Sequence, residues 1–540
     1  MNTFQSERSR IYSLKGMAAS SQPLASAAGV RALEAGGTAA DAAVAVAAAL
    51  NVTEPTSTGL GGDAFVLYYS AAEKKVFALN GSGHSPQALT LELLAKQGLD
   101  RELPPFHPYT VTVPGACAAW SDLVERFGKL PLDQVFADAI DMAERGFPVA
   151  PITSYFWQRG AERQLRTAPN GRELTIDGRG PNPGEIFTNP GLAKTLRKIA
   201  EGGKQAFYRG PIAEAIVDVL TQAGGCMKLD DLAQHKSNWV EPISTTYRDV
   251  RVWECPPNGQ GIAALLALNL LEGFELSALA PLSSEHLHLE IEAMRLAFAD
   301  ARRYVADPDQ SPAPLTDLLS KDYAEERRTL IDPGKAARTV RFGTPVGSSD
   351  TVYFCVVDAN GNACSMINSN YMGFGTGIVP QGWGFTLQNR GHNFSLDPRH
   401  PNALGPAKRP YHTIIPGMIT RESDQSLYAP FGVMGGFMQP QGHLQVVTAM
   451  LDHGLDPQEA LDLPRFSIDP EKEEGITAIE EGVPEGSLAE LADLGHPVRR
   501  VGGMERALFG RGQIIRRDPA TGVLEGGSDP RADGCALPAL

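Results

Sequence analysis

Thr351 stands at the head of a β-rich run inside GSSDTVYFCVVDANGNA, residues 347 to 363. A threonine hydroxyl is a poor nucleophile and needs a base beside it. A cut of the chain just before Thr351 would supply that base, because it would free an α-amine on the same residue. Such an amine has a pKa of about 7.7 to 8.0, so it can accept a proton near neutral pH. Thr351 could then attack an amide without a histidine relay, although by propensity alone it is simply a good β-former.

Other catalytic signatures are weak. The sequence contains no GxSxG nucleophile elbow and no HExxH metal motif. His286 and His288 are two positions apart on a predicted helix and point to different faces, which argues against a metal pair. The glycines of TGLGGDAFVLYYS, residues 58 to 70, lead into a strand rather than from a strand into a helix, which excludes a nucleotide phosphate loop. No metal and no cofactor is expected.

The elements around Thr351 predict a hairpin after a domain boundary. TVYFCVV (351–357) and ACSMINS (363–369) are predicted strands, and the Asn360-Gly361 pair between them is a turn signal. Thr351 opens the first strand. Residues 332–350 mix Gly, Pro, Ser and Arg without apolar periodicity, which indicates an exposed connection and the main boundary.

Helices are predicted on both sides of this hairpin. Residues 21–37 form one, with Ser21 as N-cap and a glycine pair as its stop. Thr38 and Asp41 make a capping box before the alanine-rich run 42–52, which is too short to span a bilayer and is typical of a buried helix. Amphipathic spacing predicts a helix at 285–304, and one further helix is expected around 443–454.

The composition limits the classes of molecule that this protein is expected to bind. The 540 residues suffice for two domains or one large intertwined unit. With 63 acidic and 48 basic residues the net charge is −15, which opposes binding to nucleic acid or to an anionic membrane. Six scattered cysteines without a CxxC pair fit a reducing compartment, and the N-terminus lacks the apolar core of a secretory signal. The expected location is the cytoplasm.

Several motifs together resemble the γ-glutamyltranspeptidase family of N-terminal-nucleophile hydrolases. They include GMAASSQPLASAAGVRALEAGGTAADAAVAVAAALNVTEPTSTGLGGDAF, VPGACAAW, AFYRGPIAEAI, YRDVRVWECPPNGQG, DTVYFCVVDANGNA, GFGTGIVP, GPAKRP, GVMGGF and GSDPRADG. The resemblance implies an α+β fold, a four-layer αββα sandwich. It also implies a precursor that cuts itself between Asp350 and Thr351. The products would be a large subunit, 1–350, and a small subunit, 351–540, held together as a heterodimer, with a dimer of heterodimers left open.

The same resemblance assigns the catalytic groups. Thr351 matches the nucleophile, and Ser369 matches a second hydroxyl residue that orients it. Gly435 and Gly436 match the glycine pair whose backbone N–H groups face the oxyanion, where the lack of a side chain permits close approach.

The substrate pocket departs from the pattern of glutathione-cleaving members. Those enzymes bind the α-carboxylate with an arginine and two serines, and the α-ammonium with an acid and a polar neighbour. Aligned motifs place other residue types at these positions here: Ser82 at the arginine, His412 and Thr413 at the serine pair, Arg390 at the polar neighbour, Asn393 at the acid, and either Asn370 or Tyr371 at a further asparagine.

These changes predict a different substrate. Arg390 would repel an α-ammonium, and its guanidinium fork suits a carboxylate. The expected substrate is therefore a small amide with a carboxylate and no α-amino group, as in the oxamate amidohydrolases and glutaryl acylases of the family, with oxamate the named candidate. A short segment at 395–410 favours hydrolysis over transfer. The alternatives are a γ-glutamyl hydrolase or transferase acting on glutathione-like compounds, and a non-catalytic binding relative.

Overall fold

The predicted hairpin occupies the middle of a seven-stranded antiparallel sheet. The computed structural model describes residues 8–337, 351–468 and 476–540, so Asp350 and most of the predicted boundary lie outside them. The first strand of the hairpin begins at Val352, one residue after Thr351. The sheet runs in the order β19 (Cys535–Pro538), β2 (Gly16–Ser20), β10 (Val352–Asp358), β11 (Ala363–Ser369), β3 (Asp63–Ser70), β4 (Lys75–Gly81) and β7 (Asn238–Val240).

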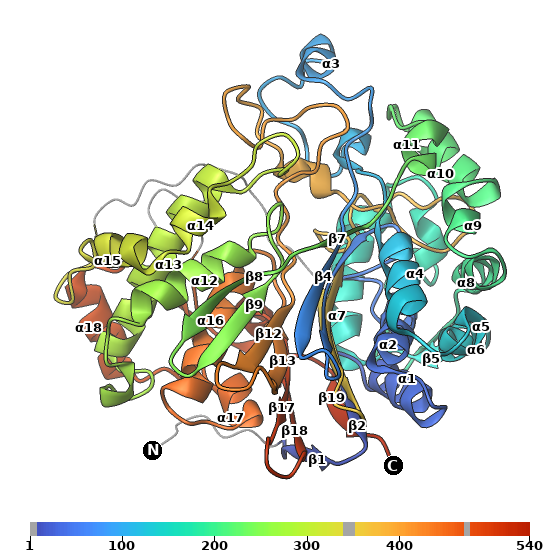
Figure 1. The fold of residues 1–540 in the computed structure, drawn as a ribbon. Helices are drawn as coiled ribbons and strands as arrows, with labels where there is room; N and C mark the ends of the chain where they lie inside the picture. Colours follow the sequence, from blue (N-terminus) through green and yellow to red (C-terminus); the bar gives the residue numbers. More distant parts are fainter. Residues whose placement is uncertain (1–7, 338–350, 469–475) are drawn as a thin grey trace.

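A second antiparallel sheet of seven strands faces the first (Figure 1). Strand β10 packs against β13 and β17 of this sheet. The approach is close at Gly432, where a Cβ atom would lie 2.5 Å from the ring of Tyr353. The order is β1 (Ile11–Ser13), β18 (Leu524–Ser528), β17 (Gly512–Arg517), β13 (Leu427–Val433), β12 (Gly417–Arg421), β9 (Val250–Glu254) and β8 (Ile243–Tyr247).

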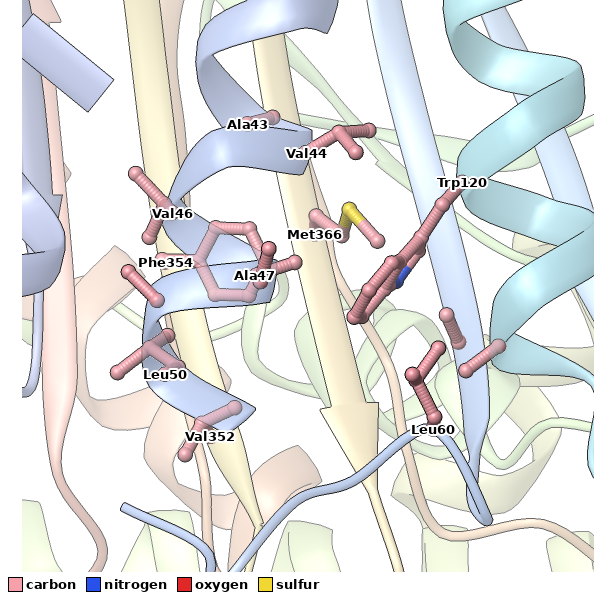
Figure 2. Close-up of a cluster of buried hydrophobic side chains, with 14 of the residues drawn as sticks. Ala43, Val44, Val46, Ala47, Leu50, Leu60, Trp120, Val352, Phe354 and Met366 are labelled. Carbon is pink, nitrogen blue, oxygen red and sulfur yellow. The ribbon is translucent and has the colours of Figure 1, made fainter. Parts of the chain in front are cut away.

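Alanine-rich helices cover the outer face of the hairpin's sheet. These are α1 (Pro23–Glu34), α2 (Ala39–Thr53) and α4 (Ala116–Phe127). Every residue of α2 is buried, as predicted for the run 42–52. Its small side chains let the helix approach the sheet closely, and Figure 2 shows Val44, Ala47 and Leu50 beside Phe354 of β10 and Met366 of β11.

One of the two predicted helix caps is confirmed and the other is wrong. Thr38 and Asp41 form the predicted capping box at the start of α2. Ser21 does not cap α1, because the N-cap position is Gln22, which makes no side-chain cap bond. The Ser21 hydroxyl instead donates to Glu54 Oε2 at 2.5 Å. A buried carboxylate thirty-three residues away therefore competes with the local cap.

Another set of helices lies on the outer side of the second sheet (Figure 1). The predicted helix 285–304 is confirmed as α13, and the one predicted around 443–454 begins five residues earlier, as α16. The helices on this side include α12 (Gly261–Leu271), α13 (Ser284–Tyr304), α16 (Met438–Leu451), α17 (Pro457–Asp462) and α18 (Glu485–Leu494).

Further helices lie on the same side of the molecule as α2, between β4 and β7 in sequence (Figure 1). They include α6 (Ala137–Arg145), α7 (Pro151–Gly160), α8 (Pro190–Gly202) and α10 (Pro211–Gln222). The molecule thus combines helices with antiparallel sheets, the α+β class that was expected. In the described ranges, no helix is long and apolar enough to cross a membrane.

Candidate active site

The open end of the β10–β11 hairpin brings two hydroxyl groups together. Val352 pairs with Asn368 in the strand register, so the residues just beyond this pair, Thr351 and Ser369, are neighbours. Thr351 Oγ1 lies 3.1 Å from Ser369 Oγ, and both residues are fully buried. The hairpin register therefore places the predicted nucleophile beside its predicted orienting hydroxyl.

Arg390 reaches this pair from a short 3₁₀ turn, Arg390–Asn393. Its Nη2 donates to Ser369 Oγ at 3.0 Å, and its Nη1 donates to Thr413 Oγ1 at 2.6 Å. The ring of Tyr371 lies 4.3 Å from the guanidinium carbon, a cation–π distance. The guanidinium is therefore fixed by two hydroxyls and a ring, one hydrogen bond away from Ser369.

The guanidinium of Arg390 is buried, and one of its N–H donors is unpaired among the described residues. The side chain is 0% exposed, and among the described residues its Nε has no hydrogen-bond partner and no carboxylate forms an ion pair with it. Burial lowers the pKa of Arg390 to about 10, while Tyr371 and Asp63 act in the opposite direction, so the group remains cationic at neutral pH. A desolvated cation with a free N–H favours an anionic ligand.

His412, at one position of the predicted serine pair, is bonded within the protein. Its Nε2 donates to Asp63 Oδ2 at 3.0 Å, and its Nδ1 accepts from the N–H of Ile414 at 3.3 Å. Burial, followed by the nearby charge of Arg390, lowers the pKa of His412 to about 4, so the ring is neutral. At this pair of positions it is Thr413 that contacts Arg390 directly.

Gly435 and Gly436 form the turn between β13 and α16. Their φ angles are 127° and 61°, a region that glycine adopts without strain. The first turn of α16 bonds their carbonyls, whereas no hydrogen bond among the described residues uses the N–H of either glycine. Gln260 Nε2 donates to the carbonyls of both Gly436, at 2.8 Å, and Thr413, at 2.7 Å. The glycine turn is therefore tied to the residue that holds Arg390.

The backbone of Tyr371 also contributes to the hydroxyl cluster. Tyr371 has a φ of 79°, which is uncommon for a residue other than glycine, and its N–H donates to Ser369 Oγ at 2.8 Å. The side chain of its neighbour Asn370 turns away and donates to Thr386 Oγ1 at 3.0 Å. Of these two residues, it is Tyr371 that contacts Arg390.

Two predicted pocket residues, Asn393 and Ser82, bond to groups outside the cluster of Thr351, Ser369 and Arg390. The Asn393 side chain donates to the carbonyl of Tyr411 at 3.0 Å, and its Oδ1 has no donor in the part of the chain that the structure describes. The Ser82 hydroxyl donates to Asn80 Oδ1 at 2.7 Å. Ser82 is linked to the site through its chain neighbour Gly83, whose N–H donates to Asp63.

Sequence reasoning missed Asp63 and Gln260. Asp63 follows the GLGG turn and pairs with Ser369 across β3 and β11. Gln260 lies within the PPNGQG stretch, just before α12. Both residues lie in motifs that carry the family resemblance, and that position was the available signal.

The chain is similar to known proteins in both sequence and structure. A family model described as gamma-glutamyltranspeptidase matches residues 25–539. The chain is 38% identical to the glutathione hydrolase-like YwrD proenzyme of Bacillus subtilis, over 97% of this chain and 98% of that protein. It is 34% identical to an oxamate amidohydrolase proenzyme of Klebsiella pneumoniae, with the same coverage. The crystal structure of a cephalosporin acylase from Bacillus halodurans matches with a TM-score of 0.93 and 46% identity, over 99% of this chain and 98% of that one.

Proposed function

Because this chain belongs to the gamma-glutamyltranspeptidase family, we propose that it is a self-cleaving amidohydrolase for small amides that carry a carboxylate, with oxamate as the named candidate. The family membership, together with relatives that are named proenzymes, supports an enzyme of the N-terminal-nucleophile type. The proposed cut lies between Asp350 and Thr351. It would give subunits 1–350 and 351–540, and the two facing sheets with outer helices support a four-layer αββα sandwich.

The observation that carries the substrate proposal is the buried guanidinium of Arg390. It has an unused N–H and no acidic partner among the described residues, and Ser369 alone separates it from Thr351. A substrate carboxylate would satisfy both the charge and the free donor, whereas an α-ammonium would be repelled. Asn393 is an amide rather than an acid, so this position offers no charge to hold an ammonium.

The proposed reaction has two halves. The free α-amine of Thr351 takes the hydroxyl proton while Oγ1 attacks the amide carbon, and the N–H groups of Gly435 and Gly436 stabilise the oxyanion. Collapse of this intermediate breaks the C–N bond, and the amine returns the proton to the departing ammonia. Water then attacks the acyl ester by the same route, which releases the acid and restores Thr351.

Substitution of the nucleophile tests the proposal directly. Thr351→Ala removes the attacking oxygen and should leave a single uncut chain without amidase activity, because both reactions use the same atom. Denaturing electrophoresis and mass spectrometry of the purified protein would check this, with wild type expected to yield a fragment that begins at Thr351. A cleaved or active Thr351→Ala variant would remove this residue from the mechanism. An uncut wild-type chain would favour a non-catalytic relative.

The substrate class needs a separate comparison. We expect ammonia release from oxamate to exceed the turnover of a γ-glutamyl anilide, since Arg390 should exclude the α-ammonium. Because one relative is named glutathione hydrolase-like, a γ-glutamyl compound is the alternative substrate. A clear preference for the anilide would refute the proposed reading of the pocket. We further propose the cytoplasm as the site of action.

A further inference from the structure

A buried ion pair lies near the end of β10 where Thr351 stands. Arg511 Nη1 donates to Glu54 Oε1 at 3.0 Å, and the two side chains are 5% and 1% exposed. Glu54 follows α2 and belongs to the proposed large subunit, whereas Arg511 precedes β17 in the proposed small subunit. The reaction proposed above uses neither of these charges.

The two sheets are aligned so that β13 runs toward the Thr351 end of β10. Tyr353 of β10 packs on Gly432 of β13. Further from that end, Ser365 pairs with Cys355 of β10 and donates to the carbonyl of Phe431 at 3.4 Å. The step from Phe431 to Gly432 on β13 therefore follows the step from Cys355 back to Tyr353 on β10.

Arg511 lies at the next step in this direction. Two residues after Gly432, the N–H of Met434 donates to the carbonyl of Arg511 at 3.2 Å. Two residues before Tyr353, β10 is preceded by Thr351. The alignment of the sheets thus places Arg511 on the second sheet opposite the start of β10.

Glu54 approaches the same point from the helix side. Figure 2 shows Leu50 of α2 beside Val352, the first residue of β10. Glu54 follows one helical turn later, since its N–H donates to the carbonyl of Leu50 at 2.8 Å. Its Oε2 accepts from Ser21, which comes just after β2, the strand that pairs with β10. The ion pair with Arg511 therefore closes around the start of β10.

We propose that Arg511 is a positioning residue that holds the Glu54 carboxylate away from the α-amine of Thr351, so that this amine stays free to act as the base. The inference rests on the proposed function, because the amine exists only after the cut. Only the neutral amine can take the proton of Thr351 Oγ1. A carboxylate bonded to the amine would favour the ammonium form and make the base unavailable.

The surroundings of Glu54 explain why its partner matters. Burial raises the pKa of Glu54, while Arg511 and then the Ser21 hydroxyl act in the opposite direction. A buried carboxylate either takes up a proton or binds a cation. Without Arg511, the ammonium form of Thr351 would be a cation within reach, and the two charges would stabilise each other.

Other ionisable groups also face the start of β10. On the side of β11 and β3 these are Arg390, Asp63, His412 and Tyr371; within β10 it is Tyr353; and on the side of β17 and β2 they are Asp529 and Asp533. All of them stay unchanged in the variants below. Their effect on the amine therefore cancels when the variants are compared.

The experiment measures the protonation of the amine without any substrate. Acetic anhydride reacts only with the neutral amine, so mass spectrometry of the peptide that begins at Thr351, after trace acetylation at pH 5 to 10, gives the midpoint of its titration. We expect this midpoint to rise by about one pH unit in Arg511→Gln and to fall by about the same amount in Glu54→Gln. That size is expected for one charge about 10 Å away at an effective dielectric constant of about 20.

Three further variants make the test specific to this ion pair. The double variant Arg511→Gln with Glu54→Gln removes both charges and should return near the wild-type midpoint. Arg511→Lys keeps the cation and should also stay near wild type. Glu525→Gln is the matched control, because it breaks an ion pair with Arg516 toward the other end of β17, and it should leave the midpoint unchanged.

The outcomes separate this inference from the proposed function. An unchanged or lowered midpoint in Arg511→Gln would overturn the inference. Glu54→Gln covers the case in which Arg511→Gln fails to fold, because the new amide still accepts from Arg511, and an unchanged midpoint there would also contradict it. If the midpoints shift as expected but oxamate is not hydrolysed, the inference stands and the substrate proposal falls. Hydrolysis of oxamate with unshifted midpoints would mean the reverse, and an uncut wild-type chain would refute both.

Discussion

Asp63 organises the residues around the proposed catalytic pair, Thr351 and Ser369. Its Oδ1 accepts three N–H groups, from Gly83, Gly115 and the side chain of Gln388, and its Oδ2 accepts the N–H of His412. Four chain segments therefore converge on one buried carboxylate. Since these donors occupy Asp63, it attracts Arg390 without pairing with it, and the guanidinium stays available to a ligand.

Gln260 should affect catalysis more than the stability of the fold. Its amide holds the carbonyls of Thr413 and Gly436, so a Gln260→Glu change would set a carboxylate against two carbonyl oxygens and displace the glycine turn. We expect kcat to fall about 10- to 100-fold while the free energy of unfolding changes by only about 1 to 3 kcal/mol. Steady-state kinetics and denaturant unfolding would measure the two effects.

Gln458→Glu is the matched control, because this buried glutamine also bonds backbone groups but lies on α17, where it binds Ser528. It should lower stability and leave kcat near wild type. Equal effects of the two substitutions on kcat would mean that Gln260 has no special connection to the site.

At the scale of residues, sequence patterns brought forward the proposed catalytic groups but not the residues that hold them. Thr351, Ser369, Arg390 and Thr413 were named from motifs and do lie together. Asp63 was missed because its bond to His412 joins residues 349 positions apart, and no local pattern reports such a contact. For the same reason, the sequence could not reveal that Nε2 of His412 is already bonded.

Helix α13 carries two histidine contacts in different directions. His286 Nε2 lies 3.0 Å from His453 Nε2, and His288 Nδ1 lies 2.7 Å from His496 Nε2, so the two-residue spacing separates their partners as expected. One turn beyond His286, Glu290 accepts a hydrogen bond from Thr448 and borders a cavity of about 20 Å³ between α13 and α16. That volume suits a single water molecule.

The pH dependence of stability should reveal Glu290. Burial raises its pKa to about 7, well above the value of about 4.3 for an exposed glutamate. Its contribution to stability is therefore complete below about pH 4.3 and is lost as the pH rises through about 7. Glu290→Gln keeps the acceptor for Thr448 and cannot ionise, so its advantage over wild type should grow from near zero at acidic pH to about 3 kcal/mol at pH 9.

Denaturant unfolding of both proteins at pH 5, 7 and 9 would measure this difference. His286, whose pKa burial lowers to about 4, is present in both proteins and cancels in the comparison. A gap between the two proteins that is the same at every pH would show that Glu290 does not change its protonation on folding.

Helices and strands were predicted correctly where the sequence signals for them are local. The capping box of α2, the β10–β11 hairpin and the amphipathic stripe of α13 each depend on residues a few positions apart. The start of α16 was placed too late because its first turn, at Met438–Gly442, contains a proline and a glycine that resemble a loop. Packing against β13 overrides those local preferences.

Both large sheets contain strands from before and from after the proposed cut. In one sheet, β10 and β11 lie between β2 and β3, so strands from beyond Thr351 pair on both sides with strands from before it. In the other sheet, β9 and β8 from the first part of the chain adjoin β12 from the second. No linear sequence pattern reveals this arrangement, because it depends on which distant strands pair.

The cut protein should therefore behave as one particle. We expect fragments 1–350 and 351–540 to co-elute in equal amounts from a sizing column, at the volume of the uncut Thr351→Ala variant, because separation would break backbone ladders in both sheets. They should part only in denaturant. Native elution in two peaks, each with a single fragment on a denaturing gel, would contradict this.

The position of β19 adds a constraint on timing. This strand, Cys535–Pro538, pairs with β2, whose other edge pairs with β10, the strand that Thr351 precedes. While the ribosome is still adding residue 500, β19 has not yet been made. The sheet that carries the proposed nucleophile then lacks one of its strands. Self-cleavage should therefore take place only after synthesis is complete. A chain that is terminated before β19 should stay uncut and inactive.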